Sequence, residues 1–215
     1  MLNIRQLDPA DTATASRWDD FVFACPEASF FHRSAWQQVI RNVFRHATYF
    51  LYAESAAGIL GVLPLAHVNS RLFGNALVAL PFAVYGGIAS ADANSATALE
   101  NAAQELARKL GVDHLEFRNV APRHMEWPTQ DLYVTFRKAI DPDSEKNMLA
   151  IPRKQRAMVR KGIKEDLRAE IDERVERHYD LYSESLRNLG TPVFGRRYLE
   201  ILKAVFGDAC DIVTI

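Results

Sequence analysis

Cysteines and long apolar runs are scarce in this chain of 215 residues. Its two cysteines, Cys25 and Cys210, lie far apart and match no metal-binding spacing, so we expect small buried apolar residues in a reducing cytoplasm. No apolar run approaches the ~18 residues that span a bilayer. The densest stretch, Ala76 to Tyr85, is only strand-sized and contains a proline. The first residues lack a basic segment followed by an apolar core, so we expect a cytoplasmic protein without a signal peptide or membrane span.

Common catalytic motifs are also missing. The sequence contains no G-x-S-x-G nucleophile elbow, no H-E-x-x-H zinc motif, no P-loop and no dinucleotide fingerprint. We therefore predict no metal site and assign no catalytic residue. The histidines show no ligand spacing, and we expect each to be structural or exposed. They are His32, His46, His67, His114, His124 and His178.

Neither sign of charge dominates the composition. The 26 basic and 27 acidic residues give a formal net charge of -1, which excludes a generic polyanion binder and makes any basic patch a local feature. Apolar residues make up 48% of the chain and charged residues 25%, as in ordinary globular proteins. The length fits one large domain or two small ones with a proper core.

One basic stretch, Ile151 to Leu167, stands out from this balance. Its cations recur at helical spacing, and no acidic residue occurs before Glu165. Apolar side chains fall on the opposite side, so the pattern predicts an amphipathic helix with a cationic face. A solvated face usually interleaves both signs of charge, so we favour an anionic partner: phosphate, carboxylate or nucleic-acid backbone. The cations are Arg153, Arg156, Arg160 and Lys164 in one row, with Lys154 and Lys161 beside it, and the apolar residues are Met158, Val159 and Ile163.

The remaining periodicity predicts strands alternating with helices. Because the chain ends on an apolar strand, we expect a first domain at residues 1–141 and the N-terminal part of a second at residues 142–215. Phe30, Phe31 and Trp36 are expected in the core. We expect strands at residues 2–7, 48–54, 59–69, 77–85, 112–119, 132–140, 168–171 and 210–215, and helices at 10–24, from 34 onward, 93–110, 151–167, 175–189 and 196–206.

This order of elements is typical of GNAT-type acyltransferases, and several segments closely resemble the FemAB-like family. The resemblance is to the branch associated with PEP-CTERM/exosortase and exopolysaccharide systems, also described as a CelD-like acetyltransferase domain. It implies an α/β (α+β) fold: a GNAT-like mixed sheet flanked by helices, in tandem, with the second domain incomplete here. The segments are SFFHRSAW, GVLPL, SRLFGNALVALPFAVYGG, HLEFRN, RKQRAMVRKGIK and NLGTPVF.

The resemblance also implies an activity. Fem peptidyltransferases move an amino acid from aminoacyl-tRNA to an amine on a peptidoglycan precursor, and basic residues near their domain junction meet a substrate phosphate. Lys154, Arg156, Arg160 and Lys161 match that basic pattern. The resemblance thus implies that the full-length protein is an acyl or aminoacyl transferase that forms an amide on an envelope or exopolysaccharide precursor. It implies no bound cofactor and an anionic partner, either a nucleotide-linked precursor or tRNA.

Two alternatives remain open: a CoA-dependent N-acetyltransferase, and a noncatalytic GNAT-like module that binds an anionic glycan precursor or nucleic acid. The acyl donor is either aminoacyl-tRNA or acyl-CoA. A CoA enzyme usually carries R/Q-x-x-G-x-G/A after a strand, where backbone N–H groups hold the pyrophosphate. Residues 187–192 imitate its start but place Pro192 where a free N–H is needed and follow a helix, so we expect a helix end.

A possible cleft is predicted near Tyr85, Gly86, Glu116 and Arg118. The Tyr85-Gly86-Gly87 segment follows a strand and could bring the backbone close to a ligand, although a simple turn explains it equally well. Glu116 and Arg118 point to the same side of a strand. They could line the cleft or pair with each other.

Overall fold

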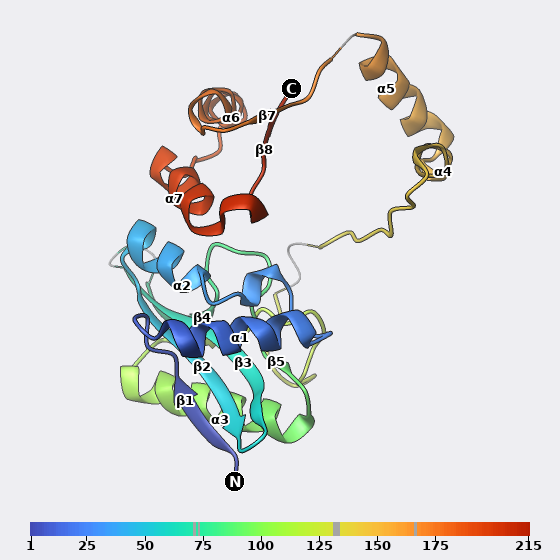
Figure 1. The fold of residues 1–215 in the computed structure, drawn as a ribbon. Helices are drawn as coiled ribbons and strands as arrows, with labels where there is room; N and C mark the ends of the chain where they lie inside the picture. Colours follow the sequence, from blue (N-terminus) through green and yellow to red (C-terminus); the bar gives the residue numbers. More distant parts are fainter. Residues whose placement is uncertain (71, 73, 131–133, 166) are drawn as a thin grey trace. The chain divides into compact units, whose positions relative to one another are not determined.

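The computed structural model describes residues 1–70, 72, 74–130, 134–165 and 167–215, which divide into two compact units (Figure 1). Unit 1 comprises Met1–Arg123 and Phe194–Cys210. Unit 2 comprises His124–Val193 and Asp211–Ile215. The units therefore part before the expected boundary at residue 141, and a late segment of the chain joins the first unit.

Unit 1 is built on a mixed sheet with the strand order β1-β2-β3-β4-β6, in which β5 pairs with β3. All pairings are antiparallel except that of β4 with β6, which is parallel. The predicted fold class, a mixed sheet flanked by helices, is confirmed. The strands are β1 (Asn3–Gln6), β2 (Ala47–Ser55), β3 (Gly58–Ser70), β4 (Gly74–Ala79), β5 (Ala89–Ser90) and β6 (His114–Glu116).

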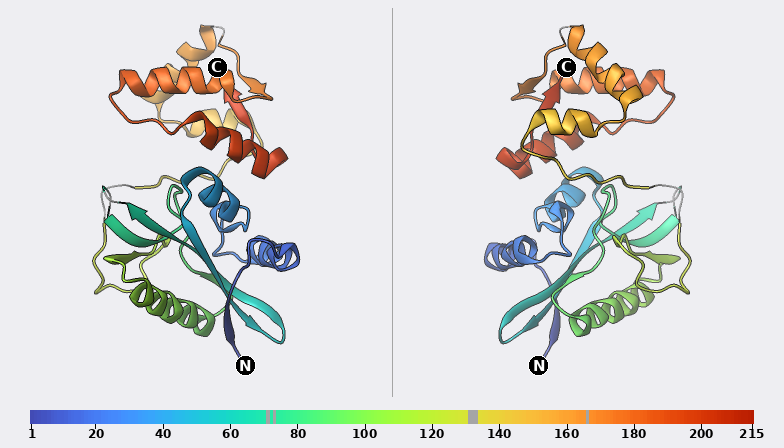
Figure 2. Two further views of the ribbon diagram at one scale, coloured as in Figure 1. Left: turned by 90° about the vertical axis from the view of Figure 1, so that its left-hand side faces the viewer. Right: turned by 90° about the vertical axis from the view of Figure 1, so that its right-hand side faces the viewer.

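Alternation along β2 creates a core on each face of this sheet. Phe50 and Tyr52 belong to the cluster that holds Trp18 of α1 (Thr12–Ala24), whereas Leu51 and Ala53 belong to the cluster that holds Leu99 of α3. Figure 2 shows α1 and α3 on opposite sides of the sheet. A shift of β2 by one residue would exchange the two sets, so burial on both faces fixes its register.

Capping explains where the two long helices of unit 1 begin. The Asp11 side chain accepts a hydrogen bond from the Thr14 N–H at the start of α1, and Asp92 accepts one from the Ser95 N–H at the start of α3. Helix α3 spans Ala93–Leu110 as predicted and ends at Gly111. The helix expected from residue 34 is short. A 3-10 turn, η1 (Phe30–His32), precedes α2 (Trp36–Val39), and a π-helical turn, η2 (Ile40–Phe44), continues it.

Helix α7 (Arg196–Phe206) explains why a late segment belongs to unit 1. The Phe206 ring is buried 4.7 Å from the Phe30 ring and 5.2 Å from the Trp36 ring, measured between centroids. Trp36 is buried as predicted, Phe31 is half-buried, and Phe30 keeps part of its ring exposed. Beyond α7, the 3-10 turn η3 (Gly207–Ala209) leads to Cys210. Cys210 is half-buried, whereas Cys25 is buried as predicted.

Unit 2 contains three helices and a two-stranded antiparallel sheet within its described residues. The predicted basic helix is confirmed as a helix, and the chain turns after Asn188 as predicted, with Gly190 donating its N–H to the Arg187 carbonyl. No helix in the described part of the chain is long and apolar enough to cross a membrane. The elements are α4 (Ser144–Ala150), α5 (Arg153–Lys164), β7 (Glu170–Asp172), α6 (Glu176–Asn188) and β8 (Ile212–Thr214).

Three expected strands need correction. Residues 134–140 form no strand, because their alternating apolar side chains are exposed and have no strand partner; the other two positions of that prediction, Leu132 and Tyr133, lie outside the described residues. The strand expected at 77–85 ends at Ala79, since Leu80 takes a positive φ of 45° and Pro81 lacks an N–H. The strand expected at 112–119 is reduced to β6, because the chain beyond it binds a loop instead of a strand.

Candidate functional site

The predicted site residues lie at two places, one in each unit. Tyr85, Gly86, Glu116 and Arg118 are brought together in unit 1, where β4 and β6 end. The predicted basic residues share α5 in unit 2. We describe the two places separately as the strand-end site and the basic helix.

The strand-end site arises from the parallel pairing of β4 with β6. Ala76 pairs with His114 and Val78 with Glu116, so both chains leave the sheet at the same end. Carboxyl ends of neighbouring parallel strands are where open α/β sheets commonly bind ligands, because loops can separate there. The loop of residues 80–88 follows β4, and residues 117–119 follow β6.

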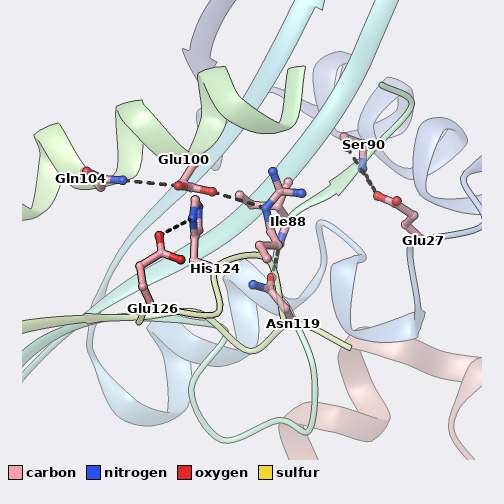
Figure 3. Close-up of polar contacts among 9 residues, drawn as sticks. Glu27, Ile88, Ser90, Glu100, Gln104, Asn119, His124 and Glu126 are labelled. Atoms are coloured by element: carbon pink, nitrogen blue, oxygen red, sulfur yellow. Dashed lines mark hydrogen bonds and ion pairs between the residues drawn. The ribbon is translucent and has the colours of Figure 1, made fainter. Parts of the chain in front are cut away.

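Hydrogen bonds fix the 80–88 loop to the segment after β6. The Gly87 N–H donates to the Arg118 carbonyl over 3.1 Å, and the Ile88 N–H donates to Asn119 Oδ1 over 3.2 Å. The Arg118 guanidinium donates in return to the Ala83 carbonyl over 2.7 Å. Figure 3 shows the Asn119 amide reaching the backbone at Ile88. The 80–88 loop is therefore fastened to the segment that follows β6.

Gly86 and Gly87 are required by contacts within the protein itself. A Cβ at Gly86 would lie 2.4 Å from Leu80 Cβ, and its φ of +149° is strained for other residues. A Cβ at Gly87 would lie 2.0 Å from Asn119 Oδ1. The close backbone approach predicted for this segment thus serves the turn. Tyr85, beside it, is half-buried.

His32 binds the backbone of the same turn and is structural, as predicted. The ring is buried, with Nε2 3.0 Å from the Gly87 carbonyl oxygen and Nδ1 3.0 Å from the Ser29 N–H. The carbonyl only accepts, so we assign the hydrogen to Nε2 and the lone pair to Nδ1. Burial lowers the pKa of His32 below its usual value near 6.5, because the protonated ring would lose its hydration.

Glu116 and Arg118 form an ion pair, which was one of the two interpretations of their spacing. Arg118 Nε lies 2.6 Å from Glu116 Oε1, and both side chains remain partly exposed. The same guanidinium binds the Ala83 carbonyl. Arg118 therefore positions the 80–88 loop and neutralises the carboxylate that ends β6.

Two carboxylates and one amide near this site were not singled out from the sequence. The Glu27 carboxylate accepts hydrogen bonds from the Ser90 N–H (3.2 Å) and hydroxyl (3.4 Å), next to β5. The buried Glu100 of α3, labelled in Figure 3, pairs with Arg123 over 3.3 Å. Nothing in the spacing signals Glu27 or Glu100. Asn119 had a weak signal, since it is the last residue of the strand expected at 112–119 and ends the HLEFRN segment.

In the basic helix, Lys154, Arg160 and Lys161 are exposed, and none of them makes an ion pair with any residue that the structure describes. Arg156 differs from them. Its guanidinium donates to the carbonyls of Leu149 (2.8 Å) and Ile151 (2.9 Å), the last groups of α4. Three of the four predicted anion-binding residues thus have free charges, and the fourth fastens α4 to α5.

A separate shallow hollow of about 430 Å³ lies at the start of α6. Most of its charges are paired within the protein, because Arg177 binds Asp172 and Glu170, and Arg174 binds Glu176. The bonds from Arg177 and Thr214 lower the pKa of Asp172. This hollow contains none of the residues predicted from sequence, and we do not regard it as the functional site.

No family model and no curated protein matches this chain. Among solved structures, it is similar to a GNAT family acetyltransferase from Staphylococcus aureus, with 10% sequence identity and a TM-score of 0.43 over 65% of this chain and 98% of the other. It is also similar to the aminoglycoside antibiotic 6'-N-acetyltransferase AAC(6')-IG from Acinetobacter haemolyticus. There the identity is 17% and the TM-score 0.42, over 65% of this chain and 99% of the other.

Proposed function

We propose that this protein is an acyltransferase of the FemAB-like group, which transfers an acyl or aminoacyl group to an amine of a cell-envelope or exopolysaccharide precursor. The observation that carries the proposal is the strand-end site. Unit 1 runs strand, two helices, antiparallel strands, helix and a parallel strand. This matches the order that favoured a GNAT-type acyltransferase from sequence, except for the last expected strand, of which residues 134–140 form none.

The chemistry of such a transfer suits a site without a nucleophile. A neutral amine attacks the carbonyl carbon of an activated ester, the bond from that carbon to the ester oxygen breaks as the amide forms, and a proton from the amine passes to the departing oxygen, which leaves as a hydroxyl. Holding the two reactants in line and stabilising the oxyanion can supply most of the rate enhancement. The 80–88 loop supports this because Arg118, Asn119 and His32 fix its backbone before any substrate binds.

The basic helix supports an anionic substrate. Lys154, Arg160 and Lys161 are free to bind phosphates of a nucleotide-linked acceptor or of a donor tRNA, and no carboxylate among the described residues neutralises them. Arg156 would contribute by keeping α5 in place. We propose the three free cations as the anion-binding residues and Arg156 as their positioning residue.

We propose an aminoacyl ester, carried by tRNA, as the donor in preference to acyl-CoA. Residues 187–192 form the end of α6, where the Thr191 N–H donates to the Leu186 carbonyl. That N–H is consumed by the helix end, and Pro192 has none to offer. This segment therefore cannot present the run of free N–H groups that a pyrophosphate needs.

A transfer assay tests the proposal. Labelled amino acid on charged tRNA, and separately labelled acetyl-CoA, would be incubated with the protein and an amine-bearing nucleotide-linked precursor, and amide product measured by mass spectrometry. We expect product from charged tRNA only. Product from acetyl-CoA only, with thermal stabilisation by acetyl-CoA, would identify a CoA-dependent N-acetyltransferase. Salt-sensitive binding of the precursor without product from any donor would identify a noncatalytic module.

A further inference from the structure

Helix α5 carries an apolar surface that anion binding does not explain. Met158, Val159 and Ile163 lie on the side opposite Arg153 and Lys164, and their exposed fractions are 67%, 40% and 64%. Soluble proteins rarely leave such an apolar strip uncovered without a use for it. A helix that only bound phosphates would need the cations and not these three side chains.

Two more apolar side chains near the ends of α5 are exposed. They are Leu149 at the end of α4 and Leu167 after α5. Arg156 ties this arrangement together, because its bonds to the Leu149 and Ile151 carbonyls join the end of α4 to the first turns of α5. The end of α4 is thereby joined to α5, whose own apolar side chains lie opposite its row of cations.

Charge complementarity identifies what would cover this surface. From Arg153 to Lys164 the helix has six cations and no acidic residue, although the whole chain has a net charge of -1. An apolar face bordered by Lys and Arg is the composition of helices that lie flat in a membrane interface, with apolar side chains among the acyl chains and cations at anionic headgroups. A protein partner would need both an apolar groove and a dense acidic rim. An anionic bilayer instead offers an apolar interior and negatively charged headgroups over its whole surface.

We propose that α5 docks this protein onto the surface of a bilayer rich in anionic lipid. Met158, Val159 and Ile163 enter the interface, and Lys154, Arg160, Lys161 and Lys164 bind lipid phosphates. Gln155 and Gly162 lie within the apolar side and reduce the apolar area that can enter the bilayer. The docking is therefore shallow, reversible and sensitive to salt. It does not depend on acyl transfer, and it would place the enzyme where envelope precursors carried by lipids are found.

Vesicle sedimentation tests this docking directly. The full chain would be mixed with sucrose-loaded vesicles of equal parts phosphatidylglycerol and phosphatidylcholine, and with vesicles of phosphatidylcholine alone. We expect binding to the anionic vesicles only, and its loss when salt is raised from about 0.05 M to about 0.5 M. Equal binding to both vesicles, or no binding to either, would overturn the proposal.

Two pairs of matched variants separate the contributions of charge and apolar surface. Each cation near an anionic surface strengthens binding about fivefold, so Arg160→Gln/Lys161→Gln should weaken binding about 25-fold, and Arg108→Gln/Lys109→Gln in α3 should not. Val159→Ser/Ile163→Ser should weaken it at least about tenfold, unlike Val134→Ser/Ile140→Ser, which alters more exposed residues of the same types outside α5. Circular dichroism would confirm that all four remain folded.

The second pair also distinguishes membrane docking from simple phosphate or RNA binding. If Val159→Ser/Ile163→Ser binds anionic vesicles as tightly as the parent protein, no apolar side chain enters the bilayer and the proposal is wrong. The same cations are proposed above to bind substrate phosphates, so tRNA should compete with the vesicles for them. If tRNA displaces the parent protein and Val159→Ser/Ile163→Ser binds the vesicles as tightly as the parent, α5 is a nucleic-acid surface and the docking proposal is wrong. Failure of acyl transfer in the assay above would leave vesicle binding unaffected, so the two proposals fail separately.

Discussion

At the scale of single residues, the strand-end site depends on two side chains that hold one turn. The Asn119 side chain accepts a hydrogen bond from the Ile88 N–H, and the His32 ring donates one to the Gly87 carbonyl. Both bonds involve buried backbone groups, so losing either leaves a polar group without a partner. These residues influence any chemistry at the site through the shape of the 80–88 loop.

Gly87→Ala should destabilise unit 1 by roughly 2–3 kcal/mol, the range for overpacking a filled site. The new methyl would lie 2.0 Å from Asn119 Oδ1 and 2.9 Å from Asn119 Cα, so backbone must move as well. Urea unfolding followed by tryptophan fluorescence measures the change. Gly195→Ala is the control, because a Cβ there meets nothing within 4 Å. Equal stability of the two variants would show that the loop does not pack as described.

His32 should make unit 1 less stable as the solution is acidified. Burial lowers its pKa in the folded state, so below about pH 6.5 the unfolded chain binds a proton that the folded protein does not. The free energy of unfolding should fall as pH drops from about 6.5 toward the folded pKa. His32→Asn should be less stable near neutral pH but show a shallower decline, measured by urea unfolding at several pH values. The exposed His114→Asn is the control. A decline as steep in His32→Asn as in the parent would exclude His32 as its source.

At the scale of elements, α5 and α7 show how differently two amphipathic helices can be used. Helix α7 buries Phe206 against Phe30 and Trp36, so its apolar side belongs to the core of unit 1. Helix α5 exposes its apolar side and its cations alike. The difference lies in whether a complementary surface exists within the described chain.

Phe206→Ala should cost roughly 3–5 kcal/mol of stability in unit 1, because it removes a buried ring and leaves a cavity beside two aromatic neighbours, Phe30 and Trp36. Urea unfolding with tryptophan fluorescence reports it through Trp36. Phe136→Ala, at a side chain 93% exposed, should change stability by less than about 0.5 kcal/mol. Similar small effects in both would show that α7 does not pack on the first unit.

Arg156 and Arg160 should respond differently to the same substitution. Arg156→Gln should lower helix content, seen by circular dichroism, because the carbonyls at the end of α4 lose their donor. Arg160→Gln should leave helix content unchanged and weaken binding of a short oligonucleotide, with a smaller dependence on salt. Unchanged helix content in Arg156→Gln would remove its positioning role and return it to the set of free cations.

At the scale of the whole molecule, the chain crosses between its two units more than once. Unit 1 is completed by Phe194–Cys210, which follows most of unit 2 in sequence. Unit 1 is therefore made of two separate segments of the sequence. The expectation that the protein has two tandem GNAT-like domains stays a prediction.

Limited proteolysis should reveal this organisation. Trypsin should cut first at Arg137 or Lys138, because the surrounding residues 134–140 are exposed and outside any helix or strand. Mass spectrometry of the first fragments identifies the site, and Arg137→Gln/Lys138→Gln should slow that cut. A first cut inside α1 or α3 would show that unit 1 is less stable than its packing indicates.

Local periodicity determined a large part of the structure. Helices α3 and α7 have the predicted bounds, α1 and α5 lie within the predicted ranges, and the β2–β3 hairpin forms as expected. These elements are predictable because their apolar residues, caps and turns lie within a few positions of one another. The basic face of α5 is likewise visible in the sequence, since spacing alone places its cations together.

Only the tertiary structure decided the rest, because those features depend on residues far apart in the chain. It set the parallel pairing of β4 with the short β6, and it gave Gly86 and Gly87 their reason in contacts with Leu80 and Asn119. It placed α7 in unit 1 and left residues 134–140 without a strand partner. The spacing of apolar residues in the sequence indicates which helix or strand a segment can form. Whether its apolar side is then buried or left exposed to a partner depends on the surfaces that the folded chain offers for packing.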